Sequence, residues 1–235
     1  MTPVPSPRPA RNRSLLAIAG SAVAGSAVVG LVVLATAIAS GVAIVAPDGH
    51  VGGRGYAQWL GKWWQVALST PPGGPICQRS GDVELLMATP FGKGPNRCTV
   101  PGTRIVYVNG PAGECSTVEK PPNHGGTDAE LKACAQRSYK AVSQTSLTID
   151  GEAVPHLDRW TVATPVYAFT LPKQNILAAT TLHGRSAAYG VGFLIKGLAP
   201  GIRVIRLSGS DEGHSVVLTY RIRVLPLRSE RPLGH

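Results

Sequence analysis

The chain has 235 residues and a formal net charge of +10. Its hydrophobic fraction of 43% allows one large domain or two small ones. The basic residues are not interleaved with aromatic residues as they are in known nucleic-acid-binding modules, which excludes nucleic acid as the expected partner. Arg8, Arg11 and Arg13 carry three of the positive charges and leave +7 for residues 14–235.

An uncharged apolar segment of 32 residues runs from Leu15 to Ala46. Cleaved signal peptides have an apolar region of roughly 7 to 15 residues, whereas a membrane-spanning helix needs about 20. The length therefore predicts a transmembrane anchor over residues 14–46, with the basic tail 1–13 in the cytoplasm. The alternative is cleavage after Ala37-Ile38-Ala39, before Ser40, which would release a secreted protein. Both alternatives place the rest of the chain outside the cytoplasm.

All four cysteines follow the apolar segment, at Cys77, Cys98, Cys115 and Cys134. No pair has the spacing of a zinc site or a redox motif, so the pattern favours two disulfides in an oxidising compartment over free buried thiols. Of the three connectivities we favour the sequential one, because it closes two short loops. Each loop of about 20 residues would contribute roughly 3 kcal/mol by constraining the unfolded chain.

A Gly-rich linker is predicted over residues 47–55, and the stretch YAQWLGKWWQVALSTPP follows it. Apolar residues at three- and four-residue steps predict a short helix that stops at Pro71. The stretch has three interpretations: a core helix, a ligand platform or a membrane-interface belt. Tyr56 and Trp59 lie on the predicted buried stripe, while Trp64 points about 100° away from Trp63. Trp64 is therefore the main candidate for ligand binding, with Tyr56 and Trp59 as further candidates.

The rest of the domain, predicted as residues 56–225 before a flexible tail 226–235, has mostly strand patterns. A second helix is indicated by a capping box of Thr127 and Glu130. From Leu147 onward apolar residues recur at every second position, as in a strand with one buried side, and this alternation is clearest in VVLTYRIRV near the C-terminus. We expect a mainly β fold, an antiparallel β-sandwich with the two short helices packed at its edge.

The succession YAQWLGKWWQVALSTP, VELLMATPFG, RCTVPGTRIVYV and LKACA resembles a bacterial family of exported proteins of uncharacterised function. The later stretches IDGEAVPHLDRW and LAPGIRVIRLSG fit the same pattern, so the resemblance covers roughly residues 55–225. It implies an exported or surface protein, and it carries over no catalytic residue. The sequence departs from the family pattern at two places, and both departures weaken the expectation that this surface binds a ligand shared by the family. Val66 stands where the family usually has a Trp, and VYVNGP stands in place of a more aromatic strand.

The sequence contains no G-x-S-x-G, S-x-x-K or H-E-x-x-H motif, so the best-marked hydrolases are excluded. No cofactor or metal is expected. The leading hypothesis is a non-catalytic extracytoplasmic module that binds a cell-envelope component or a partner protein. A second is an envelope-polymer hydrolase whose site gathers Glu114, His124, Asp128 or His214, the last of these within an acidic loop with Asp211 and Glu212. A third is a purely structural envelope protein.

Four arginines in the C-terminal stretch, at positions 203, 206, 221 and 223, are predicted to lie on solvent-facing sides of strands. Outside the cytoplasm such basic surfaces meet anionic polymers or lipid headgroups. The expected partners are the membrane, through the N-terminal helix, and an anionic envelope polymer or another envelope protein.

We predict that the mature protein retains its apolar segment. Intact-mass measurement of the protein purified from its host membrane should give a chain that still contains residues 14–46. A mature chain that begins near Ser40 would contradict the anchor and identify a secreted protein.

Overall fold

The computed structural model describes residues 42–87, 96–140, 142–211 and 214–226. The apolar segment up to residue 41 and the tail beyond residue 226 lie outside these ranges. Within them, no helix has both the length and the hydropathy that a membrane crossing requires.

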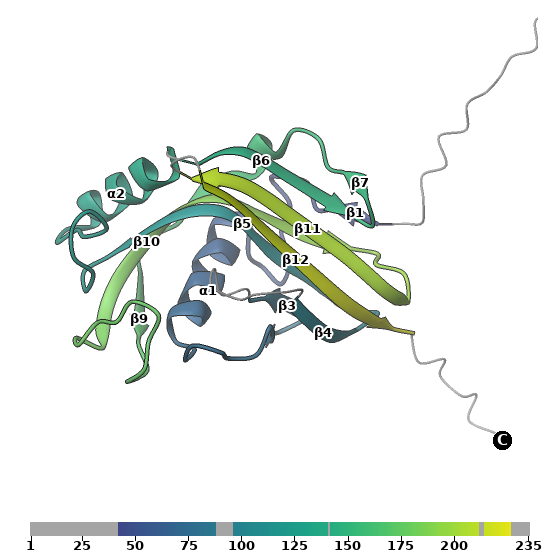
Figure 1. The fold of residues 1–235 in the computed structure, drawn as a ribbon, viewed down its shortest axis with the longest axis horizontal. Helices are drawn as coiled ribbons and strands as arrows, with labels where there is room; N and C mark the ends of the chain where they lie inside the picture. Colours follow the sequence, from purple (N-terminus) through teal and green to yellow (C-terminus); the bar gives the residue numbers. More distant parts are fainter. Residues whose placement is uncertain (1–41, 88–95, 141, 212–213, 227–235) are drawn as a thin grey trace, which may run out of the picture. The chain divides into compact units, whose positions relative to one another are not determined.

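Two β-sheets make up most of the described structure (Figure 1). The first sheet has the central order β1-β10-β5-β3-β2, and β8 and β9 also pair with β10; its strands are β1 (Ala43–Ile44), β2 (Cys77–Ser80), β3 (Val83–Leu86), β5 (Ile105–Ser116), β8 (Thr161–Ala163), β9 (Tyr167–Thr170) and β10 (His183–Lys196). The second sheet has the order β4-β12-β11-β6-β7; its strands are β4 (Asn96–Pro101), β6 (Val142–Ile149), β7 (Glu152–Ala153), β11 (Gly201–Asp211) and β12 (His214–Leu225). The two sheets share one hydrophobic core.

The mainly β fold is confirmed, but the sheets are mixed rather than antiparallel. β3 runs parallel to β5, and β4 runs parallel to β12. The chain leaves the first sheet after β3, adds β4 to the second sheet and returns as β5 beside β3. Alternation of apolar residues reports which side of a strand is buried and carries no information about the direction of its neighbours. The sequence pattern therefore missed these parallel pairs.

The clearest sequence pattern produced the longest hairpin. β11 and β12 pair from Gly201 with Val224 to Asp211 with His214. On β12, Tyr220, Ile222 and Val224 are buried, and the arginines between them are exposed. The predicted turn after β6 is also present, because both Asp150 and Gly151 have the positive φ that a tight hairpin turn needs.

The helices cover faces of the first sheet, which corrects the prediction that they pack at an edge. α1 (Tyr56–Leu68) packs mainly on β10 and also contacts β9, β8 and β5. α2 (Asp128–Lys140) packs on β5 and β10, and its predicted capping box joins Thr127 and Glu130 through reciprocal hydrogen bonds of 2.9 and 3.2 Å. A Cβ on Gly113 would lie 2.3 Å from the Ala135 carbonyl oxygen. The missing side chain of this glycine therefore allows α2 to approach β5.

The segment before α1 is part of the fold and not a free linker. β1 pairs with β10. The Val45 carbonyl oxygen accepts hydrogen bonds from the Tyr56 hydroxyl at 2.7 Å and from Trp160 Nε1 at 2.9 Å, and the Val51 carbonyl oxygen accepts one from Trp59 Nε1 at 3.1 Å. The structured domain thus begins by residue 42, upstream of the predicted boundary at 56, because aromatic side chains anchor a Gly-rich stretch that has no apolar period.

Two disulfides with the predicted connectivity join separate layers. Cys77 on β2 is bonded to Cys98 on β4, which links the two sheets. Cys115 on β5 is bonded to Cys134 on α2, which holds the helix on the first sheet. Both bonds indicate that the domain folds in an oxidising compartment.

We predict that replacing Cys77 and Cys98 together with alanine lowers the free energy of unfolding by roughly 3 kcal/mol, because the unfolded chain loses a closed loop of about 20 residues. Denaturant titration of the purified protein measures this difference. The matched variant with Cys115→Ala and Cys134→Ala should lose a similar amount. Losses near zero for both would show that neither loop restricts the unfolded chain.

Candidate functional site

An apolar cavity of about 260 Å³ lies between the two sheets beside α1. Trp63 and Trp64 of α1 form one side, and residues 109–112 of β5 form another. The remaining wall comes from the second sheet, through Leu207, Ser208, Gly209, Ser210, Val216, Leu218 and Tyr220. None of these lining residues is charged.

The two adjacent tryptophans of α1 have different environments. Trp63 is buried, and its Nε1 donates a 2.7 Å hydrogen bond to the Leu86 carbonyl oxygen of β3. Trp64 is half-buried and packs edge-to-face on Trp63, with ring centroids 5.2 Å apart and an interplanar angle of 87°. The Trp64 Nε1 is buried but has no hydrogen-bond partner. An indole N–H can only donate, so this group needs an acceptor that the described protein atoms do not supply.

Asn109 of β5 contributes a second polar atom without a partner. The side chain is 7% exposed, and its Oδ1 is buried without a hydrogen bond. A buried amide oxygen left unpaired costs on the order of 1–3 kcal/mol. Two residues that line this mainly apolar cavity therefore each carry a buried polar atom without a partner, one a donor and one an acceptor, and both atoms lower the stability of the free protein.

A β-bulge explains why the cavity opens here. β5 places Gly110 and Pro111 opposite the single residue Val191 of β10. A proline has no N–H to give to a ladder and is tolerated at such bulges. The bulge falls within the stretch VYVNGP, at the Gly110-Pro111 pair that follows Asn109. A second register shift on β11 lies at Ser208 to Ser210, on the opposite wall.

The structure separates the three ligand-binding candidates. Trp64 lines the cavity, whereas Tyr56 and Trp59 are 2% and 1% exposed and belong to the core. The Tyr56 hydroxyl donates to Val45 and accepts from the Leu194 amide N–H, and burial raises its pKa to about 12. Asn109 was not a sequence-based candidate; its only signal was a polar amide inside a strand-like run just before a Gly-Pro pair.

A second buried polar cluster lies where β5, β9 and β10 meet. The Ser186 hydroxyl hydrogen-bonds Glu114 Oε1 and also contacts the Cys115 carbonyl oxygen and the Tyr167 hydroxyl, both at 3.0 Å. Burial, and then the charge of Glu119, raise the pKa of Glu114 well above its usual range. Burial raises the pKa of Glu119 as well, although a 2.8 Å bond from the Ser116 hydroxyl opposes this. The two carboxyl groups therefore share a proton that resides on Glu114.

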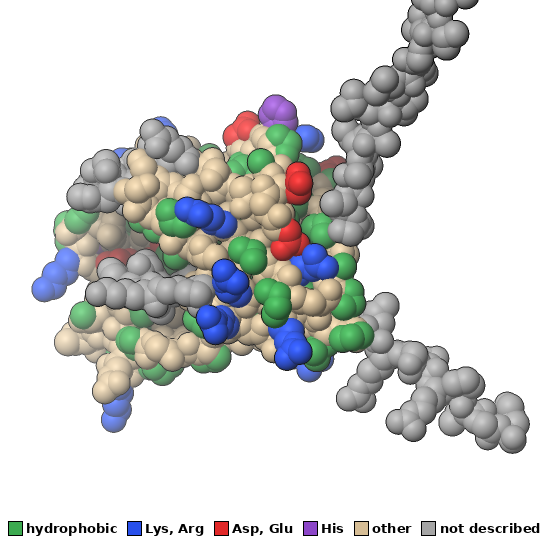
Figure 2. Space-filling model, turned by 45° about the vertical axis from the view of Figure 1, so that its right-hand side comes forward, with side chains coloured by type: hydrophobic (Ala, Val, Ile, Leu, Met, Phe, Trp, Pro, Cys, Tyr) green, Lys and Arg blue, Asp and Glu red, His purple; other side chains and the backbone are tan. Residues whose placement is uncertain are grey.

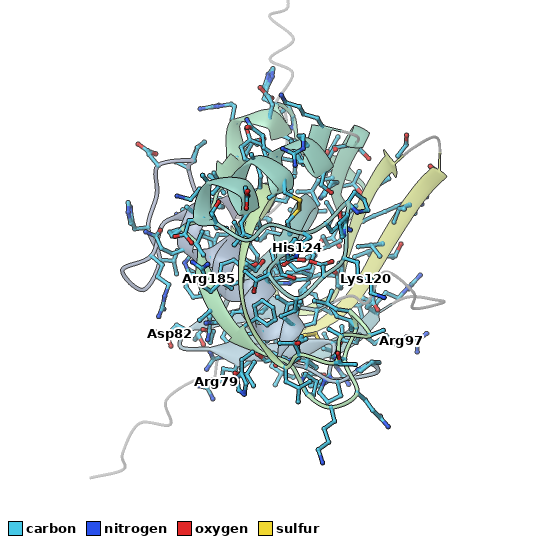
Figure 3. The ribbon with its side chains drawn as sticks, turned by 90° about the vertical axis from the view of Figure 1, so that its left-hand side faces the viewer. Arg79, Asp82, Arg97, Lys120, His124 and Arg185 are labelled. Atoms are coloured by element: carbon cyan, nitrogen blue, oxygen red, sulfur yellow. A yellow bond between two sulfur atoms is a disulfide. The ribbon has the colours of Figure 1, made fainter. Side chains whose placement is uncertain are left out.

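The residues considered for a hydrolase are only partly brought together. Glu114 meets Glu119, and the His124 charge acts on Glu119. Asp128, the first residue of α2, instead forms an ion pair with Arg185 of β10, which Figure 3 labels apart from His124. Ser186 is fully buried and Glu114 is 8% exposed, whereas Glu119 is half-buried. The side chains of Asp211, Glu212 and His214 lie outside the described residues.

No protein-family model, curated protein or solved structure matches this chain. The resemblance to exported bacterial proteins thus stays a prediction, and the function has to follow from the residues of the site. Within the described residues, no group of three or more His, Cys, Asp or Glu side chains is placed to hold a metal ion.

We predict that the domain loses stability as the pH rises above about 4.3, the ordinary pKa of a glutamate in the unfolded chain. A carboxyl group whose pKa is raised by folding stabilises the native state below its unfolded pKa of about 4.3, and that stability is lost as the pH passes through the folded pKa. Glu114→Gln, a neutral group that still donates to Glu119, should flatten the dependence. Denaturant midpoints across this pH range measure it.

Glu130→Gln provides the control. Hydrogen bonds from the backbone N–H groups of Thr127 and Gly126 lower the pKa of Glu130. The contribution of this carboxylate to folding stability is therefore lost when the pH falls and is unaffected when the pH rises. This variant should keep the wild-type decline above pH 5. An unchanged decline in Glu114→Gln would refute the shared proton.

Proposed function

We propose that this protein is a non-catalytic extracytoplasmic binding module whose inter-sheet cavity holds a neutral, mainly apolar small molecule that carries a hydroxyl group. The observation that carries the proposal is the pair of buried unpaired atoms, Trp64 Nε1 and Asn109 Oδ1, on two residues that line a mainly apolar cavity. A hydroxyl group both accepts and donates a hydrogen bond, so it matches the two needs with a single functional group.

The size of the cavity supports a small ligand. An apolar cavity of about 150 Å³ admits benzene, and ligand pockets usually span roughly 300–1,000 Å³. At about 260 Å³ the cavity suits a ligand of one or two rings, or a short acyl chain. A charged ligand is disfavoured, because the lining residues offer no opposite charge to offset its desolvation.

The unpaired atoms also favour binding over a purely structural role. A core selected only for stability would fill this space with aliphatic side chains, since removing a buried unpaired polar group is neutral or stabilising. Retaining the two atoms costs stability, which is the usual pattern at a binding site. The disulfides support a location outside the cytoplasm, where the ligand would be a component of the cell envelope or its surroundings.

We predict that the purified protein binds 2-naphthol more tightly than naphthalene. The two probes share a ring system and differ only in the hydroxyl group, which should gain hydrogen bonds of about 1–3 kcal/mol, or roughly 5- to 150-fold in Kd. Quenching of Trp fluorescence, for which Trp63 and Trp64 are the reporters, measures both affinities. Equal affinities would contradict a role for the unpaired atoms.

Two variants test the same atoms. Asn109→Leu and Trp64→Phe should each reduce the preference for 2-naphthol, while Asn109→Leu keeps or raises the free energy of unfolding by up to about 2 kcal/mol because an unpaired acceptor is removed. Glu84→Gln, a buried carboxyl outside the cavity, serves as the control and should leave the preference unchanged. A marked destabilisation by Asn109→Leu would favour a structural role for Asn109.

A further inference from the structure

The outer side of the second sheet carries a group of arginines, which we call the arginine face. It consists of Arg97 on β4, Arg206 on β11, and Arg221 and Arg223 on β12. All four are exposed, and Arg221 pairs directly with Arg97 in the ladder. Figure 2 shows basic side chains gathered on this side of the molecule, and Figure 3 shows Arg97 projecting away from the body of the domain.

No carboxylate of the described residues forms an ion pair with the arginine face. Among the described residues, the ion pairs are those of Arg185 with Asp128 and of Arg203 with Asp150. Arg203 was expected on a solvent-facing side, but it also donates to the carbonyl oxygens of Ala199 and Pro200 and closes the end of the sheet. Like charges on neighbouring strands repel each other. An anionic partner would remove this repulsion.

Aliphatic side chains are exposed on the same face. Across the described part of the chain, the exposed large hydrophobic residues are Ile202, Val216, Val217 and Leu225, and all belong to β11 or β12. Ile202 lies opposite Arg223 and is 58% exposed, while Val217 and Leu225 are 46% and 41% exposed and lie on either side of Arg221 and Arg223 along the same side of β12. Val216 lines the inter-sheet cavity instead. A water-soluble polyanion gains little binding energy from exposed aliphatic side chains. A bilayer surface gains binding energy from both the arginines and the aliphatic side chains, because its phosphates pair with the arginines and its acyl boundary buries the aliphatic groups.

The described part of the chain begins close to one end of this face. Its first residues, 42–46, are the last of the apolar segment Leu15–Ala46, and they already belong to the fold, with β1 at Ala43–Ile44. Val42 and Arg203 line the same cavity of about 450 Å³, so the chain enters the fold beside the start of β11. Ile202 and Leu225 lie at this same end of the β11–β12 hairpin.

We propose that the arginine face lies on the surface of an anionic lipid bilayer, with the arginines on lipid phosphates and Ile202, Val217 and Leu225 at the acyl boundary. This contact is independent of the inter-sheet cavity, which opens on the other side of the second sheet. It orients the domain, so that the cavity is held at a fixed position above the membrane.

The test uses the full chain in lipid nanodiscs with an environment-sensitive nitrobenzoxadiazole probe. All native cysteines are in disulfides, so Val217→Cys provides a single thiol for labelling on the arginine face. We expect the probe emission to shift to shorter wavelength, and to be quenched by nitroxide-labelled lipids, in nanodiscs that contain phosphatidylglycerol. Neither effect should occur with phosphatidylcholine alone. About 1 M salt, which shortens the Debye length to about 3 Å, should reverse both effects.

A charge variant and its matched control identify the residues responsible. Replacing Arg97, Arg221 and Arg223 with glutamine should abolish the shift. Replacing Arg79, Arg137 and Lys173 with glutamine removes the same charge from exposed sites elsewhere and should leave the shift intact. Near-ultraviolet circular dichroism confirms that each variant is folded.

Three outcomes would overturn the proposal. The first is an unchanged probe in anionic nanodiscs at low salt. The second is a shift that survives in the arginine variant. The third is a shift produced by dextran sulfate in neutral nanodiscs but not by anionic lipid, which would identify the face as a polymer-binding surface.

Discussion

The antiparallel pairing of β5 with β10 is the constraint on which the rest of the structure depends. Strands β1, β8 and β9 pair with β10, β3 pairs with β5, and both helices pack on this central pair. Its faces are therefore covered by other elements, which is why the residues of β10 from Ser186 to Ile195 are almost all buried. A two-stranded ribbon of this length would be marginal alone, and its partners supply the buried area that stabilises it.

The one irregularity in that pairing creates the candidate site. The Gly110-Pro111 bulge interrupts the otherwise regular ladder between β5 and β10, next to Asn109. The facing sheet has its own register shift at Ser208 to Ser210. Two irregular walls cannot interdigitate as regular sheets do, so a cavity remains between them. Trp64 then reaches this cavity from α1, because its neighbour Trp63 is held in place by the hydrogen bond to Leu86.

Two features of different origin thus combine in one domain. The cavity depends on backbone irregularity in the interior, whereas the arginine face depends on regular alternation along β12 and β11. Disulfides tie the layers together at β2–β4 and at β5–α2, so that the two surfaces of the second sheet keep a fixed relation to the first.

The sequence by itself determined the features that depend on local period and spacing. These are the helix from Tyr56, the capped helix after Thr127, the turn at Asp150-Gly151, the buried face of β12 and the sequential disulfides. Each of them rests on residues close together in the chain, where the 3.6-residue period, the two-residue period or a short loop limits the alternatives. The choice of Trp64 over its neighbours also followed from local geometry, the turn of about 100° per residue on a helix.

Only the tertiary structure decided the features that bring distant segments together. The parallel partners of β5 and β12 were not visible, because alternation is the same for either direction of a neighbour. The order of the stretch before α1 was hidden as well, since it depends on hydrogen bonds that the Val45 carbonyl oxygen accepts from Tyr56 and Trp160 and that the Val51 carbonyl oxygen accepts from Trp59. Asn109 looked like an ordinary strand residue, and Glu114 was a candidate only for a hydrolase site. Their unpaired oxygen and raised pKa arise from burial, and burial is a property of the folded chain and not of its local sequence.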